Sequence, residues 1–135
     1  MKVIPIKAQA GLVGFESSAA EYIEMELSLD DLLIDKPSAT WVGVAQGTSM
    51  ELDGIFDGDV LIISRAEPVK HLSVIVAVLN GVFCCKRLDI HRRALLSSQV
   101  DATPYFIQEG DDFSLVGVVT RSVRIHTPLN KKIGA

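Results

Sequence analysis

Residues 73–88 read SVIVAVLNGVFCCKRL, and this stretch decides the fold. Its two halves, 73–79 and 82–88, are rich in β-branched and other apolar residues, and Asn80-Gly81 lies between them. Asn-Gly readily adopts the two positive φ angles of a type I′ turn, so the stretch predicts a β-hairpin with a two-residue turn. We therefore expect a mainly β protein built around this hairpin.

The short turn also predicts which side chains share a face of the hairpin, because turn length sets the register. One face is expected to carry three pairs, namely Leu79 with Val82, Ala77 with Cys84, and Ile75 with Lys86. A lysine on an apolar face is unusual, because burying an ammonium is costly. Such a lysine tends to become neutral, and a neutral lysine can act as a general base. The alternative is that Lys86 lies near the strand end and extends its amine to water.

A lysine base needs a nucleophile to activate, and Ser49 is a candidate. It lies in residues 46–50, QGTSM, after a predicted strand at 40–45 and before a turn-rich segment. Gly47 permits a tight approach of the backbone, and the N–H groups of Ser49 and Met50 could form an oxyanion site. The alternative is a helix-capping or loop hydroxyl without a catalytic role.

The remaining segments predict short strands and one short helix. The alternating pattern of 24–29 predicts a half-buried strand. Ser28 as the N-cap, with Asp31 three residues later, predicts a helix that Pro37 ends. Further strands are expected at 60–63, 95–98 and 115–125.

The composition excludes several classes of protein. The length of 135 residues fits one domain, and 48% hydrophobic with 22% charged residues excludes an intrinsically disordered chain. A formal net charge of −4 disfavours a protein that holds nucleic acid by charge alone. The longest apolar run, 74–79, is too short to span a membrane, and the N-terminus lacks the apolar core of a signal peptide.

The cysteines and histidines carry little sign of redox or metal chemistry. Cys84 and Cys85 are adjacent, which disfavours a relaxed disulfide and indicates a reducing, cytoplasmic location. We interpret the pair as small apolar strand residues. The histidines at 71, 91 and 126 lack metal-ligand spacing, so no metal or other cofactor is expected.

Several motifs follow one another along the chain: GFESSAAEY at 14–22, LDDLLI at 29–34, GTSM at 47–50, IFDGDVLI at 55–62 and CKRL at 85–88. In order and spacing they resemble the UmuD family of SOS-mutagenesis proteins, which are relatives of the LexA-type self-cleaving repressors. The resemblance extends from about Gly14 to Val123. It implies the β-strand fold of the LexA and UmuD C-terminal domains, with a Ser–Lys active-site cleft and a flexible N-terminal arm.

The resemblance also implies a reaction and its residues. Ser49 matches the family's nucleophile and Lys86 its general base, in a serine endopeptidase that cuts its own arm. The bond matching the family's cleavage site is Val13–Gly14, and Ala10–Gly11 is the rival bond. Whether each arm is cut by its own domain or by that of a dimer mate stays open.

The chain departs from the family's pattern at three places. Val13 stands where Ala or Cys is usual, and Thr48 stands where Asp is common. Leu72-Ser73 replaces the Gly-Asp that usually opens the hairpin. These differences affect the expected rate of cleavage rather than its chemistry.

The resemblance further implies an arm over 1–23 and a peptidase domain over 24–135. The shortened chain is expected to form a homodimer, to join the catalytic subunit of a Y-family translesion DNA polymerase, and to arise under the influence of a RecA–single-stranded DNA filament. The 13 residues before the matching bond cannot hold a helix-turn-helix domain. Direct sequence-specific DNA binding is therefore not expected, and neither is a membrane partner.

Two other functions remain open from the sequence. A type I signal peptidase also uses a serine–lysine pair, but it needs a membrane anchor. A non-enzymatic β module that regulates a polymerase would keep the fold without cutting. Membrane fractionation tests the first alternative, and incubation of the purified protein tests the second.

Overall fold

The computed structural model describes residues 1–3, 23–24 and 27–133. Contacts within the chain divide it into two units, Met1–Asp35 and Lys36–Ala135, which we describe separately. The expected cleavage bond, Val13–Gly14, and its rival, Ala10–Gly11, lie outside the described residues.

In the first unit, Ser28 caps a short helix as predicted. β1 (Lys2–Val3) pairs antiparallel with β2 (Ile23–Glu24), and α1 (Leu29–Leu33) follows. The Ser28 hydroxyl accepts a hydrogen bond from the Asp31 N–H at 3.1 Å, and the Asp31 carboxylate accepts one from the Ser28 N–H at 3.2 Å. This capping box satisfies donors that the first helical turn leaves unpaired.

The predicted strand at 24–29 is wrong at its C-terminal end, because Leu29 begins α1. The capping hydrogen bonds hold the chain in helical geometry there, and they outweigh the alternating pattern. The prediction that Pro37 ends this helix is also wrong. α1 ends at Leu33, and Pro37 begins a separate 3₁₀ helix, η1 (Pro37–Ala39).

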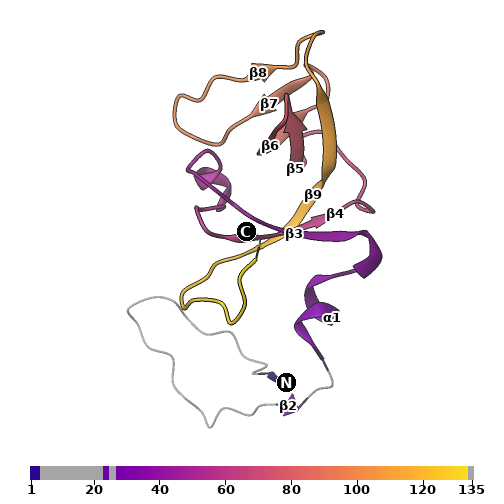
Figure 1. Ribbon diagram of the computed structural model, residues 1–135, viewed down its shortest axis with the longest axis vertical. Coiled ribbons are helices and arrows are strands. Elements are labelled where there is room, and N and C mark those ends of the chain that lie inside the picture. The colour runs from indigo at the N-terminus through magenta and orange to yellow at the C-terminus, as the bar shows by residue number, and fades with distance from the viewer. Residues whose placement is uncertain (4–22, 25–26, 134–135) are drawn as a thin grey trace. The chain divides into compact units, whose positions relative to one another are not determined.

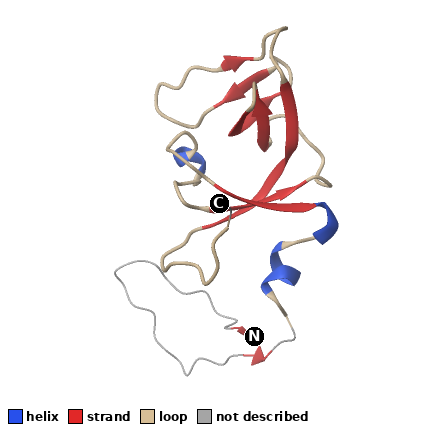
Figure 2. Cartoon of the chain, viewed as in Figure 1, coloured by secondary structure: helices blue, strands red, loops and turns tan. Residues whose placement is uncertain are grey.

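The second unit is an antiparallel sheet of seven strands in the order β3-β4-β9-β5-β6-β7-β8 (Figure 1, Figure 2). A short 3₁₀ helix, η2 (Glu51–Asp53), lies along the chain between the first two strands of this sheet. The mainly β fold is thereby confirmed. The strands are β3 (Thr40–Val44), β4 (Val60–Ser64), β5 (Val74–Leu79), β6 (Val82–Asp89), β7 (Ala94–Leu96), β8 (Tyr105–Phe106) and β9 (Phe113–Val123).

The hairpin and its register are confirmed. Asn80 and Gly81 have φ angles of 51° and 82°, which is the left-handed region that a type I′ turn requires. β5 and β6 pair with Ile75 opposite Lys86. The turn is also held from outside, because the Asn80 side-chain oxygen accepts a hydrogen bond from the Asp112 N–H at 2.9 Å.

β9 joins the two halves of the sheet, since it pairs with β4 over 118–123 and with β5 over 113–118. Each pairing has an irregularity, between Ile62 and Ile63 on β4 and between Val76 and Ala77 on β5. Such bulges bend a strand and increase its twist. Figure 1 shows β9 as a long, curved strand that reaches from β5 to β4.

Two apolar clusters lie on opposite faces of β5. One gathers Met50, Ile55, Leu61, Ile63 and Val76. The other gathers Ile75, Ala77, Leu95 and Val118. Because neighbouring residues of a strand point to opposite faces, β5 is apolar along its whole length rather than alternating. This burial on both faces is one place where the chain's large apolar content goes.

Gly117 on β9 has no room for a side chain. A Cβ atom there would lie 2.8 Å from the Ser64 carbonyl oxygen and 2.9 Å from Ile63 Cγ2. Since the first contact is with backbone, β4 and β9 would have to move apart. We expect Gly117→Ala to lower the free energy of unfolding by about 1–3 kcal/mol, measured by denaturant titration. Gly110→Ala is the control, because a Cβ there meets no atom within 4 Å; equal midpoints for the two variants would contradict the prediction.

Candidate active site

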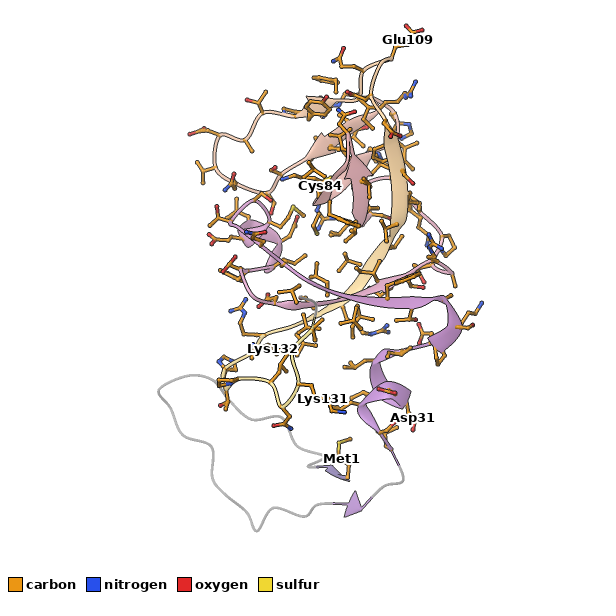
Figure 3. All side chains as sticks on the ribbon, in the orientation of Figure 1. Met1, Asp31, Cys84, Glu109, Lys131 and Lys132 are labelled. Atoms are coloured by element: carbon orange, nitrogen blue, oxygen red, sulfur yellow. The ribbon has the colours of Figure 1, made fainter. Side chains whose placement is uncertain are left out.

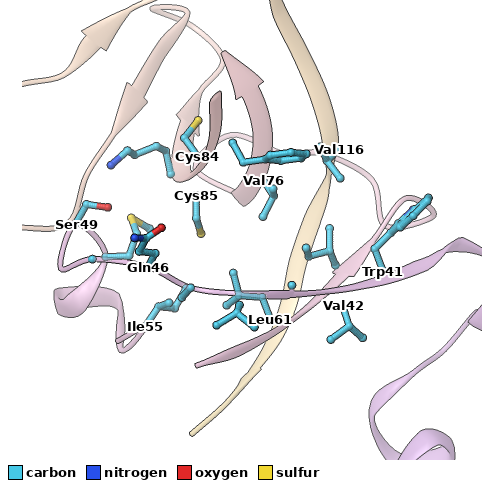
Figure 4. A pocket seen from close by; sticks show the side chains of 18 residues that line it. Trp41, Val42, Gln46, Ser49, Ile55, Leu61, Val76, Cys84, Cys85 and Val116 are labelled. Carbon is cyan, nitrogen blue, oxygen red and sulfur yellow. The ribbon is translucent and has the colours of Figure 1, made fainter. Parts of the chain in front are cut away.

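Ser49 lies in the loop between β3 and η2, and the loop is held by its own hydrogen bonds. Gly47 has a φ of 88°, so only glycine adopts this conformation without strain. The Gly47 N–H donates to the Asp57 carboxylate at 2.8 Å. These features turn the chain sharply after β3, so that Ser49 lies at one end of a pocket (Figure 4).

Met50 anchors the residue next to Ser49. Its side chain is buried in the first apolar cluster. Its carbonyl accepts hydrogen bonds from the N–H groups of Asp53 and Ile55, both at 3.1 Å. By contrast, the N–H groups of Ser49 and Met50 have no hydrogen-bond partner among the described residues. Two neighbouring backbone donors next to a hydroxyl therefore carry no hydrogen bond within the described part of the chain.

Lys86 lines the same pocket from β6. The cavity has a volume of about 640 Å³, and most of its lining is apolar, with Met50, Leu61 and Val76 among the side chains. Figure 4 shows Ser49 near one end and Trp41 near the other, with Cys84 and Cys85 between them. The fold thus brings the two residues that the sequence singled out, 37 positions apart by number, to one cavity.

Lys86 makes a hydrogen bond to Ser97, a residue that was not predicted from the sequence to belong to the site. Lys86 Nζ donates to Ser97 Oγ at 2.8 Å. Ser97 follows β7, whose Leu96 pairs with Arg87 of β6. The next antiparallel position places Ser97 opposite Lys86. This contact could be predicted from the sequence only if the pairing register of β6 and β7 were known. The predicted strand at 95–98 did not include that register.

The residues after Ser97 hold the Ser49 loop from the other side. The Ser98 N–H donates to the Ser49 carbonyl at 2.7 Å, and the Leu52 N–H donates to the Ser98 carbonyl at 3.1 Å. The Gln99 side-chain amide donates to the Thr48 hydroxyl at 2.8 Å. The segment Ser97–Gln99 therefore contacts both the loop of the serine and the amine of the lysine.

An ion pair also joins η2, which follows the Ser49 loop, to the strand of Lys86. Arg87 donates to both carboxylate oxygens of Asp53, with distances of 2.8 and 2.7 Å. These hydrogen bonds hold the pKa of Asp53 below its usual value, while Asp53 raises that of Arg87. A bidentate pair of this kind restricts how far η2 and β6 can move apart.

The two thiols in the pocket are poor nucleophiles compared with an activated hydroxyl. Cys84 and Cys85 are both free cysteines, and Cys84 appears on the hairpin in Figure 3. Burial raises the pKa of Cys85 to about 11 and also raises that of Cys84, although the charge of Lys86 opposes both shifts. Since the thiolate is the reactive form, both side chains stay largely protonated near neutral pH.

Two negative observations concern the part of the chain that is described. Within it, no three His, Cys, Asp or Glu side chains come together as metal ligands would. Nor does any helix in these ranges have the length and apolar character to cross a membrane.

Comparison with known proteins gives concordant matches. The Peptidase S24-like family matches residues 2–120. Protein ImpA of Salmonella typhimurium is 34% identical over 121 residues, covering 90% of this chain and 83% of ImpA. Protein MucA of Salmonella typhimurium is 36% identical over 125 residues, covering 91% of this chain and 86% of MucA. The LexA repressor of Bordetella avium is 31% identical over 110 residues, covering 80% of this chain and 51% of the repressor.

The family match runs from β1 into β9, so it includes the Ser49 loop, the hairpin and the strands between them. The family match and the relatives, together with the mainly β fold, lead to one conclusion: the chain belongs to the S24-like peptidases, as its resemblance to the UmuD and LexA proteins implied.

Proposed function

We propose that this protein is a serine–lysine endopeptidase that cuts its own N-terminal arm at Val13–Gly14. One observation carries the proposal. Ser49 and Lys86 line a single pocket, beside two backbone N–H groups without hydrogen-bond partners among the described residues. The pocket is mostly apolar, so it also offers a surface on which an extended peptide can bury side chains.

The reaction follows from the chemistry of the two side chains. Neutral Lys86 takes the proton of the Ser49 hydroxyl as Ser49 Oγ attacks the carbonyl carbon of Val13. The resulting ammonium returns that proton to the Gly14 nitrogen as the peptide bond breaks. An ester between Ser49 and Val13 remains, and a water molecule activated by Lys86 hydrolyses it. The products are a 13-residue peptide and residues 14–135.

The negative oxygen of the tetrahedral intermediate needs hydrogen-bond donors. The N–H groups of Ser49 and Met50 supply them in this proposal, because both are unpaired among the described residues. Met50 is only 3% exposed, so the donors belong to a segment anchored in the core. A donor that is fixed before the reaction stabilises the developing charge without reorganisation.

The biological role rests on the relatives. Cleavage removes part of the arm (1–23) and leaves the peptidase domain (24–135) as the main part of the product. The product serves as a homodimeric accessory subunit of a Y-family translesion DNA polymerase in the cytoplasm, and a RecA–single-stranded DNA filament promotes the cut. The resemblance to UmuD proteins and the matches to ImpA, MucA and a LexA repressor support this role.

Alkaline incubation of the purified 135-residue protein tests the cleavage. A deprotonated amine is the form that acts as a base, so cleavage is expected to be faster at alkaline pH than at pH 7. Intact-mass measurement should show the 13-residue peptide and its complement. A 10-residue peptide would instead assign the cut to Ala10–Gly11.

The same experiment separates the alternatives. A first-order rate constant that does not change with protein concentration indicates that each arm is cut within its own chain or within a stable dimer, and not by a collision between separate molecules. Full-length mass at every pH, with the fold intact by circular dichroism, overturns the proposal and favours the non-cleaving regulatory module. Adding a RecA–single-stranded DNA filament at neutral pH then tests the promoting partner directly.

A further inference from the structure

We propose that Ser97 is a positioning residue for Lys86, an inference that rests on the proposed self-cleavage. Ser97 Oγ accepts the hydrogen bond from Lys86 Nζ at 2.8 Å. In this role Ser97 acts through Lys86 and contacts neither the substrate nor the Ser49 hydroxyl. It holds the amine in one place in the pocket, so that Ser49 meets the lysine in a productive geometry.

The backbone supports this role, because Ser97 is tied to the strand that carries the lysine. β7 pairs with β6 through Leu96 and Arg87, and the next position of the ladder is Ser97 opposite Lys86. Both side chains are half-buried. A lysine side chain has several rotatable bonds, so an amine without a partner samples many positions. One hydrogen bond to a neighbour on the adjacent strand removes most of that freedom.

The direction of the hydrogen bond between Lys86 and Ser97 leaves Lys86 able to act as a base. An amine that donates one of its hydrogens to Ser97 Oγ keeps its lone pair for another hydrogen. The lone pair of neutral Lys86 is then available to the Ser49 hydroxyl. The proton of Ser49 passes to Lys86 and from there to the leaving nitrogen, and Ser97 neither gains nor loses a proton in the cycle.

The same segment also positions the nucleophile. The Ser98 N–H donates to the Ser49 carbonyl at 2.7 Å, and the Asp53 N–H donates to the Ser98 hydroxyl at 2.9 Å. Ser97 and Ser98 therefore connect the lysine and the serine loop through two adjacent residues. Separate elements would let the two groups move independently, whereas this connection sets their spacing.

The first test compares Ser97→Ala with Ser97→Thr in self-cleavage at alkaline pH. Misplacing a reacting group by about 1 Å can cost roughly 100-fold in rate, so we expect Ser97→Ala to cut roughly 10- to 100-fold more slowly. Ser97→Thr keeps the hydroxyl and should restore the rate to within a few fold. Ser114→Ala, which removes an exposed hydroxyl from β9, is the matched control and should cut like wild type.

The second test does not depend on cleavage. In Ser49→Ala protein, the ε-methylene protons of Lys86 should give two resolved NMR signals, because the amine is held. Adding Ser97→Ala should merge them, and adding Ser97→Thr should keep them apart. This readout follows the position of the lysine side chain, which general destabilisation of the fold would not change in the same selective way.

The outcomes separate the two proposals. A wild-type protein that stays uncut overturns the self-cleavage and with it the catalytic purpose of Ser97, even if the NMR signals respond. Ser97→Ala protein that cuts at the wild-type rate overturns only the role of Ser97. So does a slow Ser97→Ala variant that threonine does not rescue, or whose Lys86 signals match those of the parent.

Discussion

Ser49→Ala and Lys86→Ala are each expected to leave the chain at full length under alkaline conditions that cut the wild type. Without the hydroxyl, no acyl-enzyme can form. Without the amine, the hydroxyl loses its base, and such bases contribute about 10²–10⁴-fold to rate. Intact-mass spectrometry over a time course measures both effects directly.

Lys86→Arg tests whether Lys86 acts as a base or only as a positive charge. Arginine keeps the positive charge but does not deprotonate in proteins, so this variant should also stay uncut. Lys86→Met keeps most of the side-chain volume without the amine and controls for packing. Cleavage that persists in both Ser49→Ala and Lys86→Ala would remove the pair from the mechanism. Cleavage that survives Ser49→Ala but is lost in Cys85→Ala would assign the nucleophile to the thiol.

Arg124→Ala is expected to cause the largest loss of stability. Arg124 donates to both carboxylate oxygens of Asp59, which is only 2% exposed. Its guanidinium also lies 4.1 Å from the centre of the Phe56 ring. Removing one partner of such a pair leaves a buried charge uncompensated, which typically costs about 3–5 kcal/mol. Because Arg124 is partly solvated, we expect Arg124→Ala to lower the free energy of unfolding by about 2–3 kcal/mol. Denaturant titration at neutral pH measures this loss.

The pH dependence of that loss is a sharper test. Burial raises the pKa of Asp59, but hydrogen bonds from Arg124 and the Phe56 N–H outweigh it, so the pKa lies below its usual value. A lowered pKa in the folded state contributes stability above the unfolded value of about 3.9, and this contribution is lost as pH falls through the folded value. The difference in free energy of unfolding between wild type and Arg124→Ala should therefore shrink below about pH 4.

Lys70→Ala is the matched control, because it removes the same charge from an exposed position. Its stability should stay within about 0.5 kcal/mol of wild type. A Lys70→Ala loss as large as that of Arg124→Ala would point to net charge rather than to the buried pair. If the difference in free energy of unfolding between Arg124→Ala and wild type stays constant down to pH 3, the unpaired Asp59 carboxylate is not the cause of the stability loss.

Local interactions explain which parts of the fold could be predicted. The Asn80-Gly81 turn and the Ser28–Asp31 cap depend on residues within three positions of each other, and both predictions are confirmed. The strand predicted at 24–29 failed because the same local cap competed with an alternating pattern. For strand ends the errors were small, since β7 stops at Leu96 rather than at residue 98.

Contacts between distant residues account for what could not be predicted. The Asp59–Arg124 pair joins residues 65 positions apart, and the Asp53–Arg87 pair joins residues 34 apart. No pattern in the chain links an aspartate outside the strands with an arginine on, or just after, a remote strand. Both pairs depend on the order of strands in the sheet, which puts β9 between β4 and β5.

The sequence by itself determined the hairpin, the face of it that carries Lys86, and the residue types from which a serine–lysine pair could be built. Turn geometry and side-chain alternation act over a few residues, so the chain carries that information locally. Only the tertiary structure decided that Ser49 and Lys86 line one cavity and that the Lys86 amine donates a hydrogen bond to Ser97. Those facts depend on pairing between strands that are far apart in the chain, where register is set by packing on both faces of the sheet.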